Sequence, residues 1–284
     1  SLNEALAKLD YKGADEAYQK VIKLAPKNAD AYASWGRVLA GQGKYDVAIE
    51  KYLKAIKLDP WSISFIGYSL NEALAKLDYK GADEAYQKVI KLAPKNADAY
   101  ASWGRVLAGQ GKYDVAIEKY LKAIKLDPWS ISFIGYSLNE ALAKLDYKGA
   151  DEAYQKVIEL APQNAYAYAS WGRVLAGQGK YDVAIEKYLK AIKLDPWSIS
   201  FIGDSLNKAL AKLEYKDADE IYQKITKLAP QNASAYESWG RVLAEQRKYP
   251  EAIEKYQKAI ELNPDGSEGL RKRIDELEKG VKIK

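Results

Sequence analysis

The spacing of apolar residues between Ala29 and Ser62 predicts two helices joined by a short turn. Apolar positions recur at i, i+3, i+4 and i+7, the period of one helix face, and resume after a glycine-rich break. Asn28 stands where an N-cap is expected, and Pro60 ends the second pattern. The residues are Tyr32, Trp35, Gly36 and Leu39, then Tyr45, Ala48, Ile49, Tyr52, Ala55 and Ile56. The stretch predicts a helical hairpin.

This pattern repeats along the whole chain. Residues 1–68 and 69–136 are identical, and the fourth copy, from Ser205, diverges and runs into a highly charged tail. Each 68-residue copy holds two halves of 34 residues, each closed by a proline. The third copy, 137–204, differs from the first two only at Glu159, Gln163, Tyr166 and Asp204. A period of this length is typical of helical repeat arrays.

The segment WSISFIGY, at Trp61–Tyr68 and again at Trp129–Tyr136, is the most apolar stretch of each copy. Its apolar residues continue the helical spacing of the residues that follow, through Ile66, Leu70 and Leu74. We therefore expect it to be a linker followed by the first turns of a helix, rather than a strand or a membrane dip. We expect Trp61 and Phe65 to wedge between neighbouring hairpins.

The hairpin pattern resembles the signature of the tetratricopeptide repeat (TPR) family, and the resemblance covers nearly the whole chain. Its residues are Tyr32, Trp35, Gly36, Gly43, Ala48, Tyr52, Ala55 and Pro60, and the pattern recurs at Trp103, Trp171 and Trp239. The resemblance implies an all-α fold, a right-handed superhelical α-solenoid of helix-turn-helix repeats with a C-terminal capping helix.

The alternate halves, such as Ile63–Lys95, fit that signature less well. Leu70 stands where the family has a small residue, whereas Gly36 fits it. A glycine allows two helix backbones to approach closely and a leucine does not. We therefore expect hairpins that alternate between tight and more open packing.

The repeats predict a single solenoid over residues 1–284. Residues 1–28 form a truncated first repeat, 29–266 seven 34-residue repeats, and 267–284 the capping helix, with 68-residue units starting at 1, 69, 137 and 205. Leu270, Ile274, Leu277 and Val281 give the last helix one apolar stripe. Because the first repeat appears cut, its exposed stacking face is a candidate surface for homo-oligomer formation.

The composition removes several kinds of chemistry. The chain has no Cys, His or Met, which excludes disulfides, thiolate nucleophiles, imidazole bases and nearly all zinc sites. Its net charge of +5 is spread along the chain without a basic block. No segment has the length or the apolar character of a membrane span or a signal peptide, which favours the cytoplasm. We expect no enzyme activity, no cofactor and no metal.

Two features resemble catalytic motifs. The stretch GRVLAGQGKY, from Gly36 to Tyr45, has the glycines and lysine of a phosphate-binding loop, but it closes a helix and has Tyr45 in place of the metal-binding Ser or Thr after Lys44. In the fourth copy Glu245 and Arg247 replace the later glycines, so we interpret these glycines as turn residues. Carboxylate pairs such as Asp15 and Glu16 are expected on solvated outer faces of second helices.

The TPR resemblance also implies candidate binding residues, because the first helix of each repeat lines the concave groove and its ninth position points into it. Here that position alternates strictly, as Asn3, Arg37, Asn71, Arg105, Asn139, Arg173, Asn207 and Arg241. Asn can donate to and accept from a peptide backbone, and Arg can bind carboxylates. The alternative is that both residue types only keep the inner surface of the array polar and hydrated. Some members of the family bind C-terminal carboxylates with a clamp of lysines and asparagines on the inner helices. This chain matches that clamp only at its asparagines.

Further residues complete the predicted groove. Tyr68 and Tyr136 are candidate aromatic contacts, although partial packing at a helix start is the alternative. Small residues beside the ladder would leave room for a ligand chain; they are Ala33, Gly67, Ala101 and Gly135.

Three functions remain open on the sequence alone. The first is a non-enzymatic scaffold that binds a protein or peptide segment in the groove. The second, equally supported, is an engineered or recently amplified array with no specific ligand, which self-associates through its repeat ends. The third is RNA binding, which we disfavour because readers of single strands need groove residues that vary between repeats.

Overall fold

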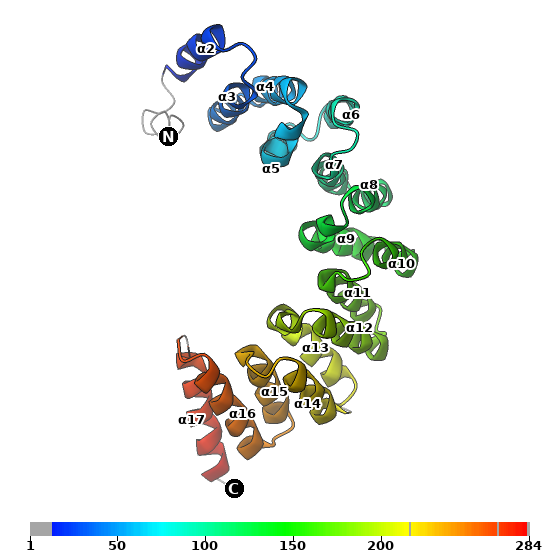
Figure 1. Ribbon diagram of the computed structural model, residues 1–284, viewed down its shortest axis with the longest axis vertical. Helices are drawn as coiled ribbons and strands as arrows, with labels where there is room; N and C mark the ends of the chain where they lie inside the picture. Colours follow the sequence, from blue (N-terminus) through cyan, green and yellow to red (C-terminus); the bar gives the residue numbers. More distant parts are fainter. Residues whose placement is uncertain (1–12, 216, 266, 283–284) are drawn as a thin grey trace. The chain divides into compact units, whose positions relative to one another are not determined.

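A computed structural model describes residues 13–215, 217–265 and 267–282, and all of its regular elements are helices (Figure 1). The chain forms two compact units, Ser1–Lys148 and Gly149–Lys284. The all-α fold predicted from the apolar spacing is confirmed. Whether both units form one continuous solenoid stays a prediction.

Unit 1 contains helices α2 to α9 and two short 3-10 turns. The helices are α2 (Ala14–Leu24), α3 (Ala29–Gly41), α4 (Tyr45–Leu58), α5 (Ile63–Lys76), α6 (Ala82–Leu92), α7 (Ala97–Gly109), α8 (Tyr113–Leu126) and α9 (Ile131–Lys144), and the turns are η1 (Pro60–Ser62) and η2 (Pro128–Ser130). The first helices of the hairpins, α3, α5, α7 and α9, lie on one side, and the second helices lie on the other (Figure 1). We call these A helices and B helices, and the surface that the A helices of one unit form its A-face.

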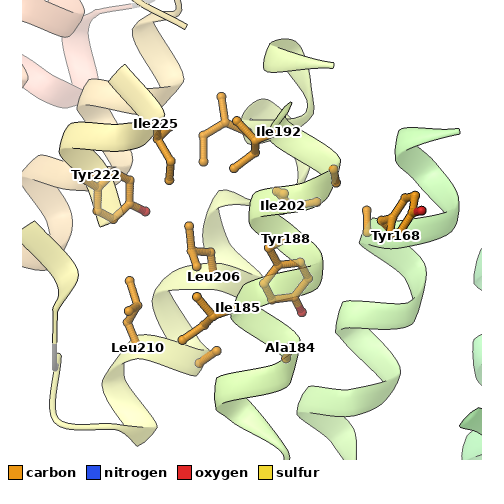
Figure 2. Packing of buried hydrophobic residues seen from close by; sticks show 14 of the residues in the cluster. Tyr168, Ala184, Ile185, Tyr188, Ile192, Ile202, Leu206, Leu210, Tyr222 and Ile225 are labelled. Carbon is orange, nitrogen blue, oxygen red and sulfur yellow. The ribbon is translucent and has the colours of Figure 1, made fainter. Parts of the chain in front are cut away.

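Unit 2 repeats this order. Its helices are α10 (Ala150–Leu160), α11 (Ala165–Gly177), α12 (Tyr181–Leu194), α13 (Ile199–Lys212), α14 (Ala218–Leu228), α15 (Ala233–Glu245), α16 (Tyr249–Leu262) and α17 (Glu268–Lys282), with the turn η3 (Pro196–Ser198). Its A helices are α11, α13 and α15. Figure 2 shows its core, in which Tyr188 of α12 packs beside Ile202 and Leu206 of α13.

The hairpin boundaries follow from local chemistry. The Asn28 side chain accepts a hydrogen bond from the Ala31 amide at 3.0 Å, which confirms the predicted N-cap of α3. Gly43 has a φ of +76°, a left-handed conformation that ends the first helix at low cost. In the last hairpin Arg247 takes the same conformation, at a φ of +62°. The glycines of GRVLAGQGKY are therefore turn residues, and the stretch runs from the end of one helix into the next.

The hairpins alternate in tightness, as predicted. Helix α3 packs along α4 over its length, whereas α5 packs mainly against α4 and α7 rather than against α6. A Cβ on Gly36 would lie 2.5 Å from Cε1 of Tyr52, which is fully buried. The glycine thus makes room for a tyrosine ring of α4, a contact that Leu70 could not reproduce.

The segment WSISFIGY forms a 3-10 turn and the start of the next A helix, as predicted. Ile63 and Ile66 are fully buried there. The expectation that Trp61 wedges between hairpins is wrong, since its side chain is 69% exposed and its equivalents are 72% and 65% exposed. Phe65 is half-exposed. The 3-10 turn turns Ser62 and Ile63 inward instead, which leaves the tryptophan in solvent.

A recurring polar contact joins every second B helix, beginning with α2, to the hairpin that follows it. Asp15 of α2 accepts hydrogen bonds from the Trp35 indole at 3.1 Å and from the Lys44 ammonium at 2.8 Å. Asp83 of α6 holds Trp103 and Lys112 in the same way. The expectation that Asp15 is only a solvated outer charge is therefore wrong. These carboxylates hold each following hairpin against the B helix that precedes it.

This contact predicts an acid-sensitive fold. The hydrogen bond from Lys44 lowers the pKa of Asp15 against a smaller opposing effect of burial, and Lys112 does the same for Asp83. A lowered folded-state pKa stabilises the fold above the unfolded value of about 4, and the stabilisation is lost as pH falls through the folded value. We expect the urea midpoint of Asp15→Asn/Asp83→Asn to fall less steeply below pH ~4 than that of the parent. Asp46→Asn/Asp114→Asn, on exposed first turns of other B helices, is the control, and equal slopes for both variants would contradict the assignment.

Helix α17 closes unit 2 as the predicted cap. Ile274 is 8% exposed and clusters with Leu243 and Tyr256, and Leu270 and Leu277 pack against the same cluster. The side chain of Val281 lies outside the described residues. The charged remainder of the helix is exposed, as an end repeat requires.

Candidate functional site

The predicted Asn and Arg ladder lies on the A helices. In unit 1, Arg37 is on α3, Asn71 on α5, Arg105 on α7 and Asn139 on α9. In unit 2, Arg173 is on α11, Asn207 on α13 and Arg241 on α15. Asn3 lies outside the described residues. The two residue types have different surroundings, which the sequence alternation alone does not reveal.

The asparagines hold three helices together. The Asn71 amide donates to the Ser102 carbonyl of α7 at 3.1 Å, and its side-chain oxygen accepts from the Tyr86 hydroxyl of α6. Asn207, which is buried, makes the same two bonds in unit 2, to Ser238 and from Tyr222. A buried amide with donor and acceptor both engaged is stabilising, because leaving either group unpaired is costly. A tyrosine lies fifteen residues after each ladder arginine as well as after each asparagine, so this spacing in the sequence did not distinguish the two roles.

The arginines are anchored at one end and open at the other. Arg37 Nη2 donates to the Phe65 carbonyl of α5 at 3.2 Å, and the guanidinium lies 5.9 Å from the Phe65 ring centroid. Arg173 contacts Phe201 in the same way, at 3.0 Å and 5.9 Å. This stacking is a cation–π contact between consecutive A helices. The remaining N–H groups of the guanidinium can donate hydrogen bonds to a ligand.

The last arginine differs because its surroundings are acidic. Arg241 forms an ion pair with Asp204 of α13 and another with Glu237, the second at 3.1 Å. Burial acts against the charged form, but Asp204 and then Glu237 outweigh it and raise the pKa of Arg241. Asp204 stands where the first two copies have Tyr68 and Tyr136. The fork of Arg241 is therefore occupied within the fold.

Tyr68 and Tyr136 are the most exposed predicted groove residues. Their side chains are 79% and 78% exposed, on the A helices α5 and α9. Partial packing at a helix start, the alternative, is therefore wrong. Trp61, Phe65, Tyr68 and Glu72 follow one another at helical spacing and form one exposed face of α5 and its preceding turn.

The small residues beside the ladder do not leave room for a ligand, contrary to expectation. Ala33 and Ala101 are buried at 1% and 0% exposure, and Gly67 and Gly135 are buried as well. A Cβ on Gly67 would lie 2.5 Å from the Ser102 hydroxyl oxygen. These residues are small because neighbouring A helices pack closely there.

No group of three or more His, Cys, Asp or Glu side chains within the described residues could hold a metal ion. Within the same residues, no helix is both long and apolar enough to cross a membrane.

Solved structures with a similar fold include yeast Tom70, which is 18% identical over 99% of this chain and 60% of that chain, with a TM-score of 0.47. The APC/C hetero-tetramer Cut9-Hcn1 is 17% identical over 90% of this chain and 51% of that chain, with a TM-score of 0.40. YrrB, described as a TPR protein with an unusual peptide-binding site, is 19% identical over 90% of this chain and 97% of that chain, with a TM-score of 0.32. This chain thus spans less than two thirds of the first two.

Family sequence profiles match the chain over most of its length. One profile of the tetratricopeptide repeat matches residues 2–62 and 70–130, and a second matches 165–196 and 233–265. No curated protein sequence matches the chain significantly. The profile matches and the tandem helical hairpins agree, and the chain belongs to the tetratricopeptide repeat family.

Proposed function

We propose that the protein is a non-enzymatic interaction scaffold that binds an extended protein or peptide segment across the A-face of unit 1. Repeat proteins that stack helical hairpins use extended surfaces of this kind for binding. The observation that carries the proposal is the exposure of Tyr68 and Tyr136, 79% and 78%, on A helices of the same unit. Tyrosine is enriched at the centres of protein interfaces because it offers a large apolar ring and a hydroxyl.

The arginines extend the proposed surface. Arg37 and Arg105 lie on α3 and α7, and the anchored guanidinium of Arg37 keeps unpaired N–H groups for a partner's carboxylate or carbonyl. An anchored side chain loses little conformational freedom on binding. The asparagines contribute differently, since Asn71 positions the helices that carry these groups.

The competing functions have weaker support. An array without a specific ligand has no need for large exposed aromatic rings, which favour aggregation. Self-association through the repeat ends, the other function predicted from the sequence, would involve residues 1–12, which lie outside the described residues. RNA binding is disfavoured because a protein that reads single strands needs groove residues that vary between repeats. Here the A-face residues of α5 and α9 are identical.

A displayed library of random short peptides tests the proposal. The full chain is used for selection, and the affinities of enriched peptides are measured for the parent and for Tyr68→Ser/Tyr136→Ser. We expect the double variant to bind at least about tenfold more weakly, since buried tyrosines at interfaces are common hot spots. The control is Val47→Ser/Val115→Ser, two half-exposed side chains on the B helices α4 and α8. Equal losses in both variants, or no saturable binder, would overturn the proposal in favour of the ligand-free array.

A further inference from the structure

Three equivalent pockets lie between an A helix, its B helix and the next A helix. The first, among α3, α4 and α5, has a volume of about 260 Å³. The second, among α7, α8 and α9, has about 300 Å³, and the third, among α11, α12 and α13, about 260 Å³. Each is lined by the ladder arginine, two tyrosines of the B helix and a serine of the next A helix. Each pocket lies within one unit.

The three pockets differ in charge. Glu72 lines the first pocket together with Arg37, and Glu140 lines the second together with Arg105 and Lys144. In the third, Lys208 replaces the glutamate, so that Arg173, Lys208 and Lys212 line it without any acidic residue. Among the described residues none of these three cations forms an ion pair. The third pocket is therefore an uncompensated cationic site.

The substitution is confined to the exposed face. Helix α13 has the same fourteen residues as α5 except at Asp204 and Lys208. Every buried residue is kept, and both changes fall on the face that carries Trp197 and Phe201. The change alters the surface chemistry of the pocket and leaves its packing intact.

A buried hydroxyl is a second feature of the third pocket, and the first two pockets share it in Tyr52 and Tyr120, so the charge alone distinguishes the third. Tyr188 lines the third pocket and is 0% exposed, yet its hydroxyl makes no hydrogen bond of normal geometry, although Ser205 lines the same pocket. Burial raises the pKa of Tyr188 to about 12, so the group keeps its proton at neutral pH. A buried donor without a partner is unfavourable, and a ligand acceptor would satisfy it.

Arg173 is already fixed in place for binding. Its Nη2 donates to the Phe201 carbonyl at 3.0 Å, and its guanidinium lies over the Phe201 ring, which itself stacks on Tyr166 at a centroid distance of 4.5 Å. The other N–H groups of the fork stay free to donate. The two lysines are exposed and can fold over a ligand.

We propose that the pocket among α11, α12 and α13 binds a phosphoryl dianion through Arg173, Lys208, Lys212 and the Tyr188 hydroxyl. A phosphoryl group carries close to two negative charges and three acceptor oxygens, which suit three cations and one neutral donor. A carboxylate carries one charge and would neutralise only one of the three cations, whereas a phosphoryl dianion neutralises about two. The phosphoryl group is either free phosphate or part of a phosphorylated side chain.

Calorimetric titration of the full chain at low ionic strength tests this site. The probes are inorganic phosphate and N-acetyl-phosphoserine N-methylamide, compared with N-acetyl-serine N-methylamide. We expect one saturable site, and we expect Lys208→Glu to weaken binding at least about tenfold, because a charge-assisted contact becomes a repulsion. Lys227→Glu, on the exposed end of α14, makes the same change in net charge and should weaken binding less than about twofold. Tighter binding of the phosphoserine probe would identify a phosphorylated side chain as the source, and tighter binding of inorganic phosphate would identify the free ion.

A substitution in an equivalent pocket tests whether phosphate binding can be gained. Glu72→Lys gives the first pocket the lysine found in the third, and we expect the titration to show a second site. Tyr188→Phe keeps the ring and removes only the hydroxyl, and it should weaken binding without lowering stability. Absence of saturable binding of either phosphorylated probe, or equal losses in Lys208→Glu and Lys227→Glu, would overturn the proposal. Neither result bears on peptide binding by unit 1.

Discussion

Tyr120→Ala is expected to lower the free energy of unfolding of unit 1 by about 3–5 kcal/mol, the usual cost of removing an aromatic side chain from a core. Tyr120 is fully buried on α8, and its ring fills the space against Gly104 of α7, where a Cβ would lie 2.5 Å from Cε1. Little of the neighbouring structure can collapse into the resulting cavity, because the helices on both sides are held by their own hairpin contacts. Urea unfolding followed by circular dichroism gives the magnitude, and hydrogen exchange should show faster opening of α7, α8 and α9.

The conservative variant separates packing from hydrogen bonding. The Tyr120 hydroxyl is buried, and its contact with Ser137 falls outside normal hydrogen-bond geometry, so Tyr120→Phe removes at most a weak interaction. We expect its stability to stay within about 0.5 kcal/mol of the parent, or to rise slightly, because an unsatisfied polar group is removed. A loss in Tyr120→Phe comparable to that in Tyr120→Ala would show that the hydroxyl, and not the ring, carries the stabilisation.

Gly67→Ala is expected to destabilise the junction between α5 and α7 by about 1–3 kcal/mol, the range for an extra methyl forced into a packed interior. The added Cβ would lie 2.5 Å from the Ser102 hydroxyl oxygen but 3.5 Å from the Ser102 Cβ, which is ordinary contact. The clash is therefore with one atom. Urea unfolding and hydrogen exchange of α5 and α7 measure the effect.

Removing that atom should rescue the variant. Ser102→Ala in the Gly67→Ala background is expected to recover most of the lost stability, whereas Ser102→Ala alone should change it little. The resulting coupling energy of a double-mutant cycle isolates the contact. Additive losses would show that α5 and α7 cannot approach with any Cβ at position 67, in which case the backbone and not the serine sets the spacing.

Much of the fold is predictable from the sequence because its signals are local. Helical spacing, the N-cap at Asn28 and the turn glycine at Gly43 each fix a boundary through contacts within a few residues. The alternation of hairpin tightness was also predictable, since Gly36 and Leu70 differ in size at equivalent positions.

The candidate site was less predictable because its residues depend on contacts between hairpins. An apolar residue such as Trp61 is expected to be buried, yet the 3-10 turn after Pro60 turns it into solvent, and no local pattern encodes that direction. Asn71 and Arg37 occupy equivalent positions and both donate to a carbonyl of the next hairpin, but only Asn71 also bonds to a tyrosine hydroxyl. Identical repeats offered no variation from which these roles could be separated.

The two kinds of junction between A helices have a consequence for how such a chain can change length. From α3 to α5 the contact is an arginine on a phenylalanine, and from α5 to α7 it is a glycine against a serine, with an asparagine bridging. Loss or gain of one 34-residue half would place two like surfaces against each other and break one kind of junction. Exchange between copies in steps of 68 residues restores both. Recombination among the near-identical copies would therefore give viable chains only in whole pairs of hairpins, and the pair is the heritable module of this protein.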